Sequence, residues 1–210
     1  MSQIMNKPKF ISFEGTEGVG KTTVINEVAN YLREQQIDFV QTREPGGSPF
    51  AETLRGLLLD PATIMSDASE LLLMFAARAD HIATVIQPAL AQGQWVLCDR
   101  FIDSTVAYQG FGRNQGNSQA LAQIALLVDN FVPTLPDVTI WLDLPVLEGM
   151  ARAKNRGKLD RFEQEQIAFF ERVHQGFAYQ AQQQPERVKR IDASGDIDAV
   201  LARVLAQLAP

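Results

Sequence analysis

Residues 15–22 read GTEGVGKT, which matches the phosphate-binding loop pattern G-x-x-x-x-G-K-[ST] at Gly15, Gly20, Lys21 and Thr22. An apolar run, KFISFE, precedes the loop, and a stretch of helical character follows it. In such a loop, backbone N–H groups turn toward phosphate oxygens, and the helix N-terminus adds a favourable partial charge. The motif therefore predicts a nucleotide triphosphate site between a strand and a helix.

The rest of the chain repeats this alternation of strands and helices. Short apolar runs at KFISFE, DFVQTR, WVLCD, VTIWLDL and RVKRIDA are separated by longer stretches with helical periodicity. This rhythm predicts an α/β fold in which helices cover a five-stranded parallel sheet. Pro88 should bend or end the longest helix. We expect helices at 21–36, 68–92, 118–132, 145–155, 163–184 and 197–208.

Length and charge narrow the class of protein. A chain of 210 residues with 46% hydrophobic content suits one globular domain, residues 1–210. The net charge of −6 argues against general affinity for nucleic acid. No apolar run reaches the roughly 18 residues that span a bilayer, and the N-terminus lacks the apolar core of a signal peptide, so we expect a cytoplasmic protein. Cys98 lies in an apolar run and is expected to be a buried, inert thiol.

The phosphate site needs cationic and metal-binding side chains. Lys21 would contact the β- and γ-phosphates of the nucleotide, and the Thr22 hydroxyl would ligate Mg²⁺. A second metal ligand should stand at the end of a neighbouring buried strand, and Asp99 closes WVLCD. Arg100 follows Asp99 directly, so a phosphate-facing guanidinium would leave the same strand end.

The loop alone does not distinguish a switch, a motor and a kinase. The chain lacks the N-K-x-D guanine-reading motif of common GTPases, and it has no basic face of the kind that DNA-repair ATPases carry. Arginine forks bind phosphate oxygens bidentately. The chain has several separated arginines that are suited to bind a second phosphorylated ligand. They are Arg43, Arg55, Arg78, Arg100 and Arg113. We favour a kinase whose acceptor carries a phosphate group. Which nucleotide or deoxynucleoside serves as the acceptor stays open at this point. The alternative from another class is a nucleotide-dependent regulatory switch.

Five stretches, FEGTEGVGKTT, TREPGG, MFAARADH, DRFIDSTVAYQGFGR and RGKLDRFEQE, resemble the successive motifs of bacterial thymidylate kinases. The resemblance runs from about Phe10 to Ile191. It implies a three-layer nucleoside-monophosphate kinase fold and transfer of the γ-phosphate of ATP to dTMP with Mg²⁺. It also implies a homodimer that associates through the long helix at 68–92.

The resemblance assigns residues to both ligands. Glu17 lies beside the deoxyribose 3′-hydroxyl in this family, Arg55 and Arg100 match acceptor-phosphate ligands, and Glu44 borders the sugar and phosphate. The phosphate loop contributes the nucleotide-binding residues Gly15, Thr16, Glu17, Gly18, Val19, Gly20, Lys21, Thr22 and Thr23. The acceptor set comprises Glu44, Arg55, Phe75, Arg78, Arg100, Ser104, Thr105, Tyr108 and Gln109.

Thymine recognition is implied for the segment MFAAR, where Arg78 would hydrogen-bond the base. The stacking aromatic often stands four residues before this arginine, where the chain has Met74; Phe75 stands three before it and is favoured because both spacings share a helix face with Arg78. Gln109 would donate to or accept from the pyrimidine edge. Tyr108 would crowd a 2′-hydroxyl and so favour deoxyribose.

A segment at about 152–162 is expected to form a lid over the nucleotide. Some thymidylate kinases carry an arginine inside the phosphate loop, whereas this chain has Gly18 there. The lid segment holds five cations within residues 152–161. The resemblance implies that Arg156 is catalytic together with Lys21, Glu17 and Arg100, and that Arg152 and Arg161 also bind the nucleotide.

Overall fold

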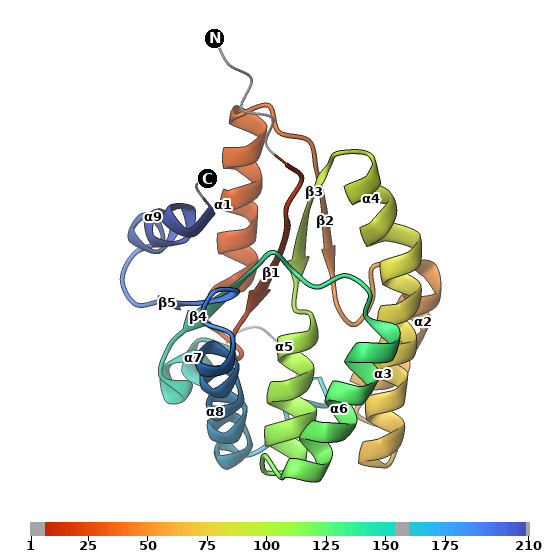
Figure 1. Ribbon diagram of the computed structural model, residues 1–210. Helices are drawn as coiled ribbons and strands as arrows, with labels where there is room; N and C mark the ends of the chain where they lie inside the picture. Colours follow the sequence, from red (N-terminus) through yellow and green to blue (C-terminus); the bar gives the residue numbers. More distant parts are fainter. Residues whose placement is uncertain (1–6, 154–159, 209–210) are drawn as a thin grey trace.

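The computed structural model describes residues 7–153 and 160–208. Its centre is a five-stranded sheet in the order β2-β3-β1-β4-β5 (Figure 1). Every adjacent pair of strands is parallel, so the carboxyl ends of all five strands meet at one edge. The five predicted strands are confirmed, and they are β1 (Phe10–Glu14), β2 (Phe39–Arg43), β3 (Trp95–Asp99), β4 (Val138–Asp143) and β5 (Val188–Asp192).

Helices cover both faces of the sheet, which gives the predicted three layers. Figure 1 shows α1 and α9 together on one side, and the apolar cluster beneath them contains residues of both. The other face is covered by α3, α5, α6 and α8. The α-helices are α1 (Lys21–Glu34), α2 (Pro49–Leu59), α3 (Asp67–His81), α4 (Gln87–Ala91), α5 (Ile102–Thr105), α6 (Ser118–Phe131), α7 (Val146–Ala153), α8 (Ile167–Gln183) and α9 (Ile197–Leu208).

Alternation along the central strand divides the core between the two faces. Ile11 and Phe13 pack toward α1 and α9, whereas Phe10 packs into the cluster of the opposite face. All three side chains are fully buried because β1 lies in the middle of the sheet. The phosphate loop therefore leaves a strand that is fixed on both sides.

The long helix predicted at 68–92 is interrupted, as Pro88 requires. Regular α-helix ends at His81, and a π-helical turn, η1 (Ile82–Ile86), precedes α4. The Gln87 N–H donates to Ile82 O. Because Pro88 has no N–H to donate, the regular hydrogen-bond ladder cannot continue through this point.

One helix start and two helical segments differ from the sequence-based expectation, and the first of these segments is α2, which is not among the expected helices. The helix predicted at 163–184 begins at Ile167, because Asp160 Oδ1 accepts the N–H groups of Phe162 and Glu163 at 2.9 Å and holds that stretch in turns. The segment after Arg100 was not predicted as an element, yet it forms α5 and a second π-helix, η2 (Val106–Arg113). Tertiary packing of η2 against α8 stabilises it despite its glycines.

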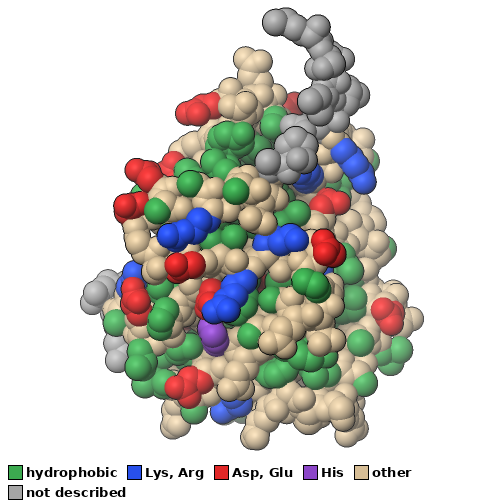
Figure 2. Space-filling model, turned by 60° about the vertical axis from the view of Figure 1, so that its left-hand side comes forward, with side chains coloured by type: hydrophobic (Ala, Val, Ile, Leu, Met, Phe, Trp, Pro, Cys, Tyr) green, Lys and Arg blue, Asp and Glu red, His purple; other side chains and the backbone are tan. Residues whose placement is uncertain are grey.

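The face shown in Figure 2 has no concentrated charge of one sign among its described residues. Figure 2 shows Lys and Arg side chains interspersed with Asp and Glu and with apolar side chains on the face that it presents. In the described part of the chain, no helix has both the length and the hydropathy needed to cross a bilayer.

Candidate active site

The phosphate loop joins β1 to α1 at the carboxyl edge of the sheet. Lys21 folds its side chain back so that Nζ donates to Gly15 O at 3.0 Å and to Thr16 O at 3.1 Å. Gly20 precedes the helix with a φ of 94°, in the left-handed region that favours glycine. Burial, and next the charge of Arg100, lower the pKa of Lys21. The ammonium group is thus held against the loop at the wall of a cavity.

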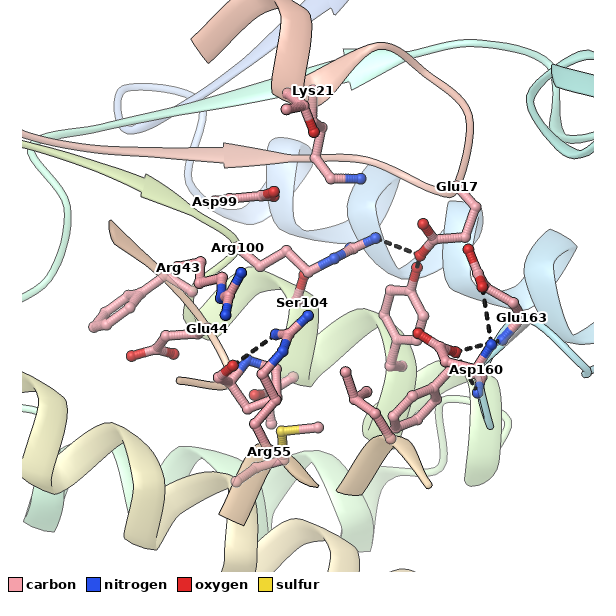
Figure 3. A pocket seen from close by; sticks show the side chains of 18 of the residues that line it. Glu17, Lys21, Arg43, Glu44, Arg55, Asp99, Arg100, Ser104, Asp160 and Glu163 are labelled. Atoms are coloured by element: carbon pink, nitrogen blue, oxygen red, sulfur yellow. Dashed lines mark hydrogen bonds and ion pairs between the residues drawn. The ribbon is translucent and has the colours of Figure 1, made fainter. Parts of the chain in front are cut away.

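The end of β3 brings two charged residues to the same place. Asp99 pairs in register with Phe13 of β1, and its Oδ1 is buried with no hydrogen-bond partner among the described residues. Arg100 has a φ of 68°, which is uncommon for a residue other than glycine. Its guanidinium donates to Glu17 Oε1 at 2.5 Å and to Gly15 O at 3.0 Å, as Figure 3 shows for Glu17. These contacts hold Arg100 beside the phosphate loop.

Glu14, the last residue of β1, is a buried carboxyl group behind Arg100. Its Oε1 accepts the backbone N–H of Phe101 at 2.7 Å and that of Ser104 at 3.3 Å. Its Oε2 shares a hydrogen bond of 2.5 Å with the Ser104 hydroxyl, whose oxygen accepts from Arg100 Nη1 at 3.1 Å. Burial, together with the charge of Asp103, raises the pKa of Glu14 from 4.5 to about 8. Glu14 therefore connects β1 to the turn that carries Arg100.

Glu44 is a second buried carboxylate, located just after β2. It accepts from Arg78 Nε at 2.7 Å and makes a hydrogen bond of 3.0 Å with His81 Nδ1. Arg78 Nη2 donates to Phe101 O at 3.2 Å, whereas Nη1 is buried and has no partner among the described residues. Because buried donors normally find an acceptor, Nη1 is the group of Arg78 that is suited to a ligand.

Two further elements complete the walls. Arg55 of α2 donates to Pro45 O at 2.7 Å, and burial, followed by the charge of Arg43, lowers its pKa. Tyr108 of η2 donates its hydroxyl to Glu17 Oε1 at 3.0 Å. Irregular helix of this π-type occurs frequently at functional sites.

Most of the residues predicted for the site line one cavity (Figure 3). They come from the phosphate loop, from the ends of β2 and β3, and from α2, α3, α5 and η2. The predicted residues on its wall are Glu17, Gly18, Val19, Gly20, Lys21, Thr22, Glu44, Arg55, Arg78, Asp99, Arg100, Ser104, Thr105, Tyr108 and Gln109. Gly15, Thr16 and Thr23 belong to the same loop and first turn but are not part of the lining.

The structure corrects the expectation for the aromatic neighbour of the base. Met74 lines the cavity, whereas Phe75 is 4% exposed and packs into the apolar cluster with Phe101 and Ile102. Although both residues share a face of the helix with Arg78, only the first of them reaches the cavity. The Arg78 guanidinium carbon lies 5.2 Å from the centroid of the Phe75 ring, so the ring supports the arginine from behind.

The cations of the expected lid segment lie in different surroundings. Arg152 is exposed on α7 and pairs with Glu148 at 2.6 Å. Arg161 does not line the cavity; it pairs with the buried Glu70 at 2.6 Å and donates to Leu58 O at 2.9 Å. Arg156 lies outside the described residues.

Several residues at the site were not predicted from the sequence. Asp160 and Phe162 line the cavity, and Glu14 and Glu70 hold lining residues from behind. Glu14 gives a usable signal, because an acidic residue that ends a buried strand needs a partner. Glu70 gives no such signal, because an acidic residue in the first turn of a helix is common without any role at a site.

No group of three or more His, Cys, Asp or Glu side chains within residues 7–153 and 160–208 is arranged to hold a metal ion. An ion at Asp99 would therefore take its other ligands from hydroxyl, water and phosphate oxygens, which is the usual environment of Mg²⁺ at nucleotide sites.

Comparison with known proteins gives one family. The family model described as Thymidylate kinase matches residues 13–204. A thymidylate kinase of Psychrobacter sp. (strain PRwf-1) is 62% identical over 200 residues, which is 95% of this chain and 96% of the relative. A thymidylate kinase of Alkalilimnicola ehrlichii is 50% identical over 208 residues, 98% of this chain and 94% of that protein.

A solved structure agrees with these relatives. The crystal structure of thymidylate kinase from Ehrlichia chaffeensis superposes with a TM-score of 0.76 at 37% identity. The match covers 96% of this chain and 98% of that one, so the similarity extends over the whole fold.

Proposed function

The chain belongs to the thymidylate kinase family, and on that premise we propose that the cavity at the carboxyl edge of the sheet is its active site. The enzyme transfers the γ-phosphate of ATP to dTMP, which gives dTDP and ADP. The observation that carries the assignment of the site is the convergence of the cationic side chains of Lys21, Arg55, Arg78 and Arg100 on one cavity. Two anionic ligands that meet end to end require this concentration of cations in a protein with a net charge of −6.

ATP binds along the phosphate loop in this proposal. The N–H groups of residues 15–23 surround the donor phosphates, and Lys21 neutralises charge on the β- and γ-phosphates. Lys21 is already held over the loop by two carbonyl oxygens, so little side-chain freedom remains to be lost when the nucleotide binds.

Thr22 and Asp99 are the residues that would hold Mg²⁺. The buried Asp99 Oδ1 has no hydrogen-bond partner among the described residues, and a buried carboxylate oxygen in that state is suited to a cation or its water shell. The ion, when bound, neutralises charge on the donor phosphates.

dTMP occupies the opposite wall. Arg55 and Arg100 bind the acceptor phosphate, Glu17 lies beside the sugar, and Tyr108 restricts the space at the 2′ position. Arg78 Nη1 reads the base. Because both Tyr108 and Arg100 contact Glu17, the side chains for the sugar and the phosphate are held as one unit.

The reaction needs no covalent intermediate on the protein. The side chains align an oxygen of the acceptor phosphate with the γ-phosphorus of ATP and neutralise the charge that spreads over the transferring group. We propose that Arg156, in the lid segment 152–162, neutralises part of that charge. Arg152 would add a further contact to ATP. Arg161, which pairs with Glu70, would anchor the C-terminal end of the segment.

We also propose a homodimer. Large apolar side chains are exposed on α2, α3 and α6, which pack against one another in pairs. They are Phe50, Leu57, Leu72, Leu126 and Phe131. Exposed apolar area of this kind is typical of an interface between subunits, and light scattering of the purified protein measures the resulting mass.

The acceptor is tested by measuring ADP release with dTMP, dUMP, CMP, AMP and thymidine, and with ATP alone. We expect the highest kcat/KM with dTMP and slow ATP hydrolysis without an acceptor, because the complete site forms only around both ligands. A preference for another acceptor would contradict the substrate assignment. Equal hydrolysis of ATP with and without dTMP would contradict the assignment of a closed, two-ligand site.

A further inference from the structure

Glu70 of α3 is a buried carboxylate that touches a cavity residue without lining the cavity itself. It is 1% exposed, and its Oε1 accepts from the Gln109 side-chain amide nitrogen at 2.8 Å. Gln109 is 3% exposed and lines the cavity. The side chain that would read the pyrimidine edge is therefore tied to a residue one layer further from the ligand.

Two arginines make Glu70 an acceptor only. Arg161 Nη2 pairs with Glu70 Oε2 at 2.6 Å, and Arg113 Nη2 lies 3.4 Å from the same oxygen. Arg113 Nε also donates to Oε1 at 3.5 Å. An ionised carboxylate in these surroundings has no proton to donate.

The orientation of the Gln109 amide follows from this charge. Only its NH₂ group can make a hydrogen bond to an acceptor-only carboxylate, so the carbonyl Oε1 must point the other way. No described residue donates a hydrogen bond to Gln109 Oε1, although Asn114 donates to the backbone oxygen of Gln109. The cavity wall thus presents a hydrogen-bond acceptor at this position.

Arg78 provides the complementary donor. Glu44 binds Nε and the Phe101 carbonyl binds Nη2, which leaves the buried Nη1 toward a ligand. The base would meet one acceptor and one donor, and a buried carboxylate determines the orientation of each.

We propose that Glu70 is a positioning residue for base specificity: it binds the NH₂ group of Gln109, so that the amide oxygen accepts the N3–H of thymine. This proposal rests on the function proposed above. Thymine and uracil present N3–H as a donor and O4 as an acceptor, whereas cytosine presents the reverse pattern, with N3 as an acceptor and an amino group as a donor. Glu70 therefore selects against dCMP through Gln109, and it does not distinguish dTMP from dUMP.

The substitution Glu70→Gln tests the proposal because it preserves the shape of the side chain and replaces one acceptor oxygen with a donor NH₂ group. Arg161 and Arg113 require an oxygen on their side of residue 70, so the new amide nitrogen faces Gln109. That nitrogen donates to the Gln109 oxygen, and Gln109 then presents NH₂ to the cavity. We expect the ratio of kcat/KM for dTMP to that for dCMP to fall roughly tenfold to a hundredfold, which is the usual cost of a mismatched buried hydrogen bond.

Matched controls separate specificity from general damage. The ratio for dTMP to dUMP should stay within about twofold, because these bases share the same hydrogen-bonding edge. Glu165→Gln removes an ion pair with the same Arg113 but does not touch Gln109, so it should leave both ratios unchanged. In a Gln109→Met background, Glu70→Gln should have no further effect on the ratio for dTMP to dCMP.

The wild-type protein offers a test that does not depend on the folding of a variant. The side-chain amide resonance of Gln109, assigned by its loss in Gln109→Met, should be protected from exchange with water in the absence of nucleotide because Glu70 binds it. Rapid exchange would overturn the proposal, as would a folded Glu70→Gln protein that keeps the wild-type preference for dTMP over dCMP. A wild-type enzyme with no preference for dTMP over the other acceptors would instead overturn the proposed function.

Discussion

Met74 and Phe75 are neighbours on α3 and have different surroundings. Met74 contributes to the cavity wall, and Phe75 packs between α3 and the turn after β3. From the sequence, the choice between them depended on their spacing from Arg78, and both spacings place the residue on the same helix face as Arg78. Only the direction of each side chain relative to the sheet separates a ligand contact from a core contact.

Phe75→Leu should lower the free energy of unfolding by about 1–3 kcal/mol, because it leaves a gap in a buried cluster. It should raise the KM for dTMP less than Met74→Ala does, because Phe75 affects the base only through its contact with Arg78. Met74→Ala should raise that KM severalfold. Urea denaturation and steady-state kinetics of the two variants measure these effects, and a larger rise in KM for the Phe75 variant would restore the aromatic as the base contact.

Asp99 has an unpartnered carboxylate oxygen that the metal proposal explains. Asp99→Asn should shift the Mg²⁺ dependence of kcat to higher concentrations and lower kcat by about a hundredfold or more at low Mg²⁺, because an amide oxygen is a weaker ligand for a hard cation. Thermal stability should not fall, since the change removes a buried charge that has no hydrogen-bond partner in the described structure. An unchanged Mg²⁺ titration would exclude Asp99 as a ligand or as a partner of the ion's water shell.

Residues at the ends of strands could be predicted for the site, because parallel strands bring their carboxyl ends to one edge. Asp99 and Arg100 are examples, whereas Lys21, the first residue of α1, was predicted from the phosphate-loop motif. The roles of Glu14 and Glu70 depend on hydrogen bonds to residues more than 35 positions away in the chain, and of the two only Glu14 carries a sequence signal, as an acidic residue that ends a buried strand. Sequence motifs identify groups that touch ligands more readily than groups that hold those contacts in place.

Among the elements, the phosphate loop and α7 meet backbone to backbone. A Cβ added to Gly18, which has a φ of +74°, would lie 1.8 Å from Gly149 O, and one added to Gly149 would lie 2.4 Å from Glu17 O. No side chain can be accommodated at position 18 without moving α7. Packing against α7 therefore accounts for the absence of an arginine at position 18, which supports the proposal that the lid segment supplies a cation.

Gly149→Ala should displace the loop and lower kcat/KM for ATP by about tenfold or more, because small misplacements of positioning groups are costly. Gly56→Ala on α2 is the matched control, since an added Cβ there meets no atom within 4 Å. That variant should retain full activity and gain up to about 1 kcal/mol of stability. Kinetics and thermal melting of both proteins provide the comparison. Wild-type activity of the Gly149 variant would contradict the close contact between α7 and the loop.

The lid proposal predicts an uneven effect of removing its cations. Arg156→Ala should lower kcat by about a hundredfold or more while the KM for dTMP changes by less than about threefold, because charge on the transferring phosphate develops in the transition state. Lys154→Ala, in the same segment, serves as the control and should reduce kcat only slightly. Single-turnover measurements with saturating ATP and dTMP distinguish the two variants, and equal rates for them would reject a special role for Arg156.

At the scale of the whole molecule, the strands, the parallel sheet and most of the helices could be predicted from the sequence. The central strands β1, β3 and β4 are short apolar runs that are largely buried, whereas the edge strands β2 and β5 are only partly buried and carry polar residues. The segment Ile102–Arg113 was not predicted because its helical form depends on packing. Close approach to α8 at Gly112 and Gly176 stabilises a π-helix whose local sequence has weak helical preference.

The buried carboxyl of Glu14 couples the stability of the whole protein to pH. Burial and the charge of Asp103 raise its pKa to about 8 in the folded state, whereas its ordinary value is 4.5. Between these values the folded protein retains a proton that the unfolded chain releases. The stabilising contribution is therefore complete below about pH 4.5 and decreases by up to about 1.4 kcal/mol per pH unit until about pH 8.

Glu14→Gln removes this titration and keeps the shape of the side chain. We expect the free energy of unfolding of the variant, relative to wild type, to increase steadily from pH 5.5 to pH 7.5, because only the wild-type protein loses stability through Glu14 over that range. Urea denaturation of both proteins at several pH values measures the difference directly. A difference that is independent of pH would mean that Glu14 is already ionised in the folded state, held by the N–H groups of Phe101 and Ser104.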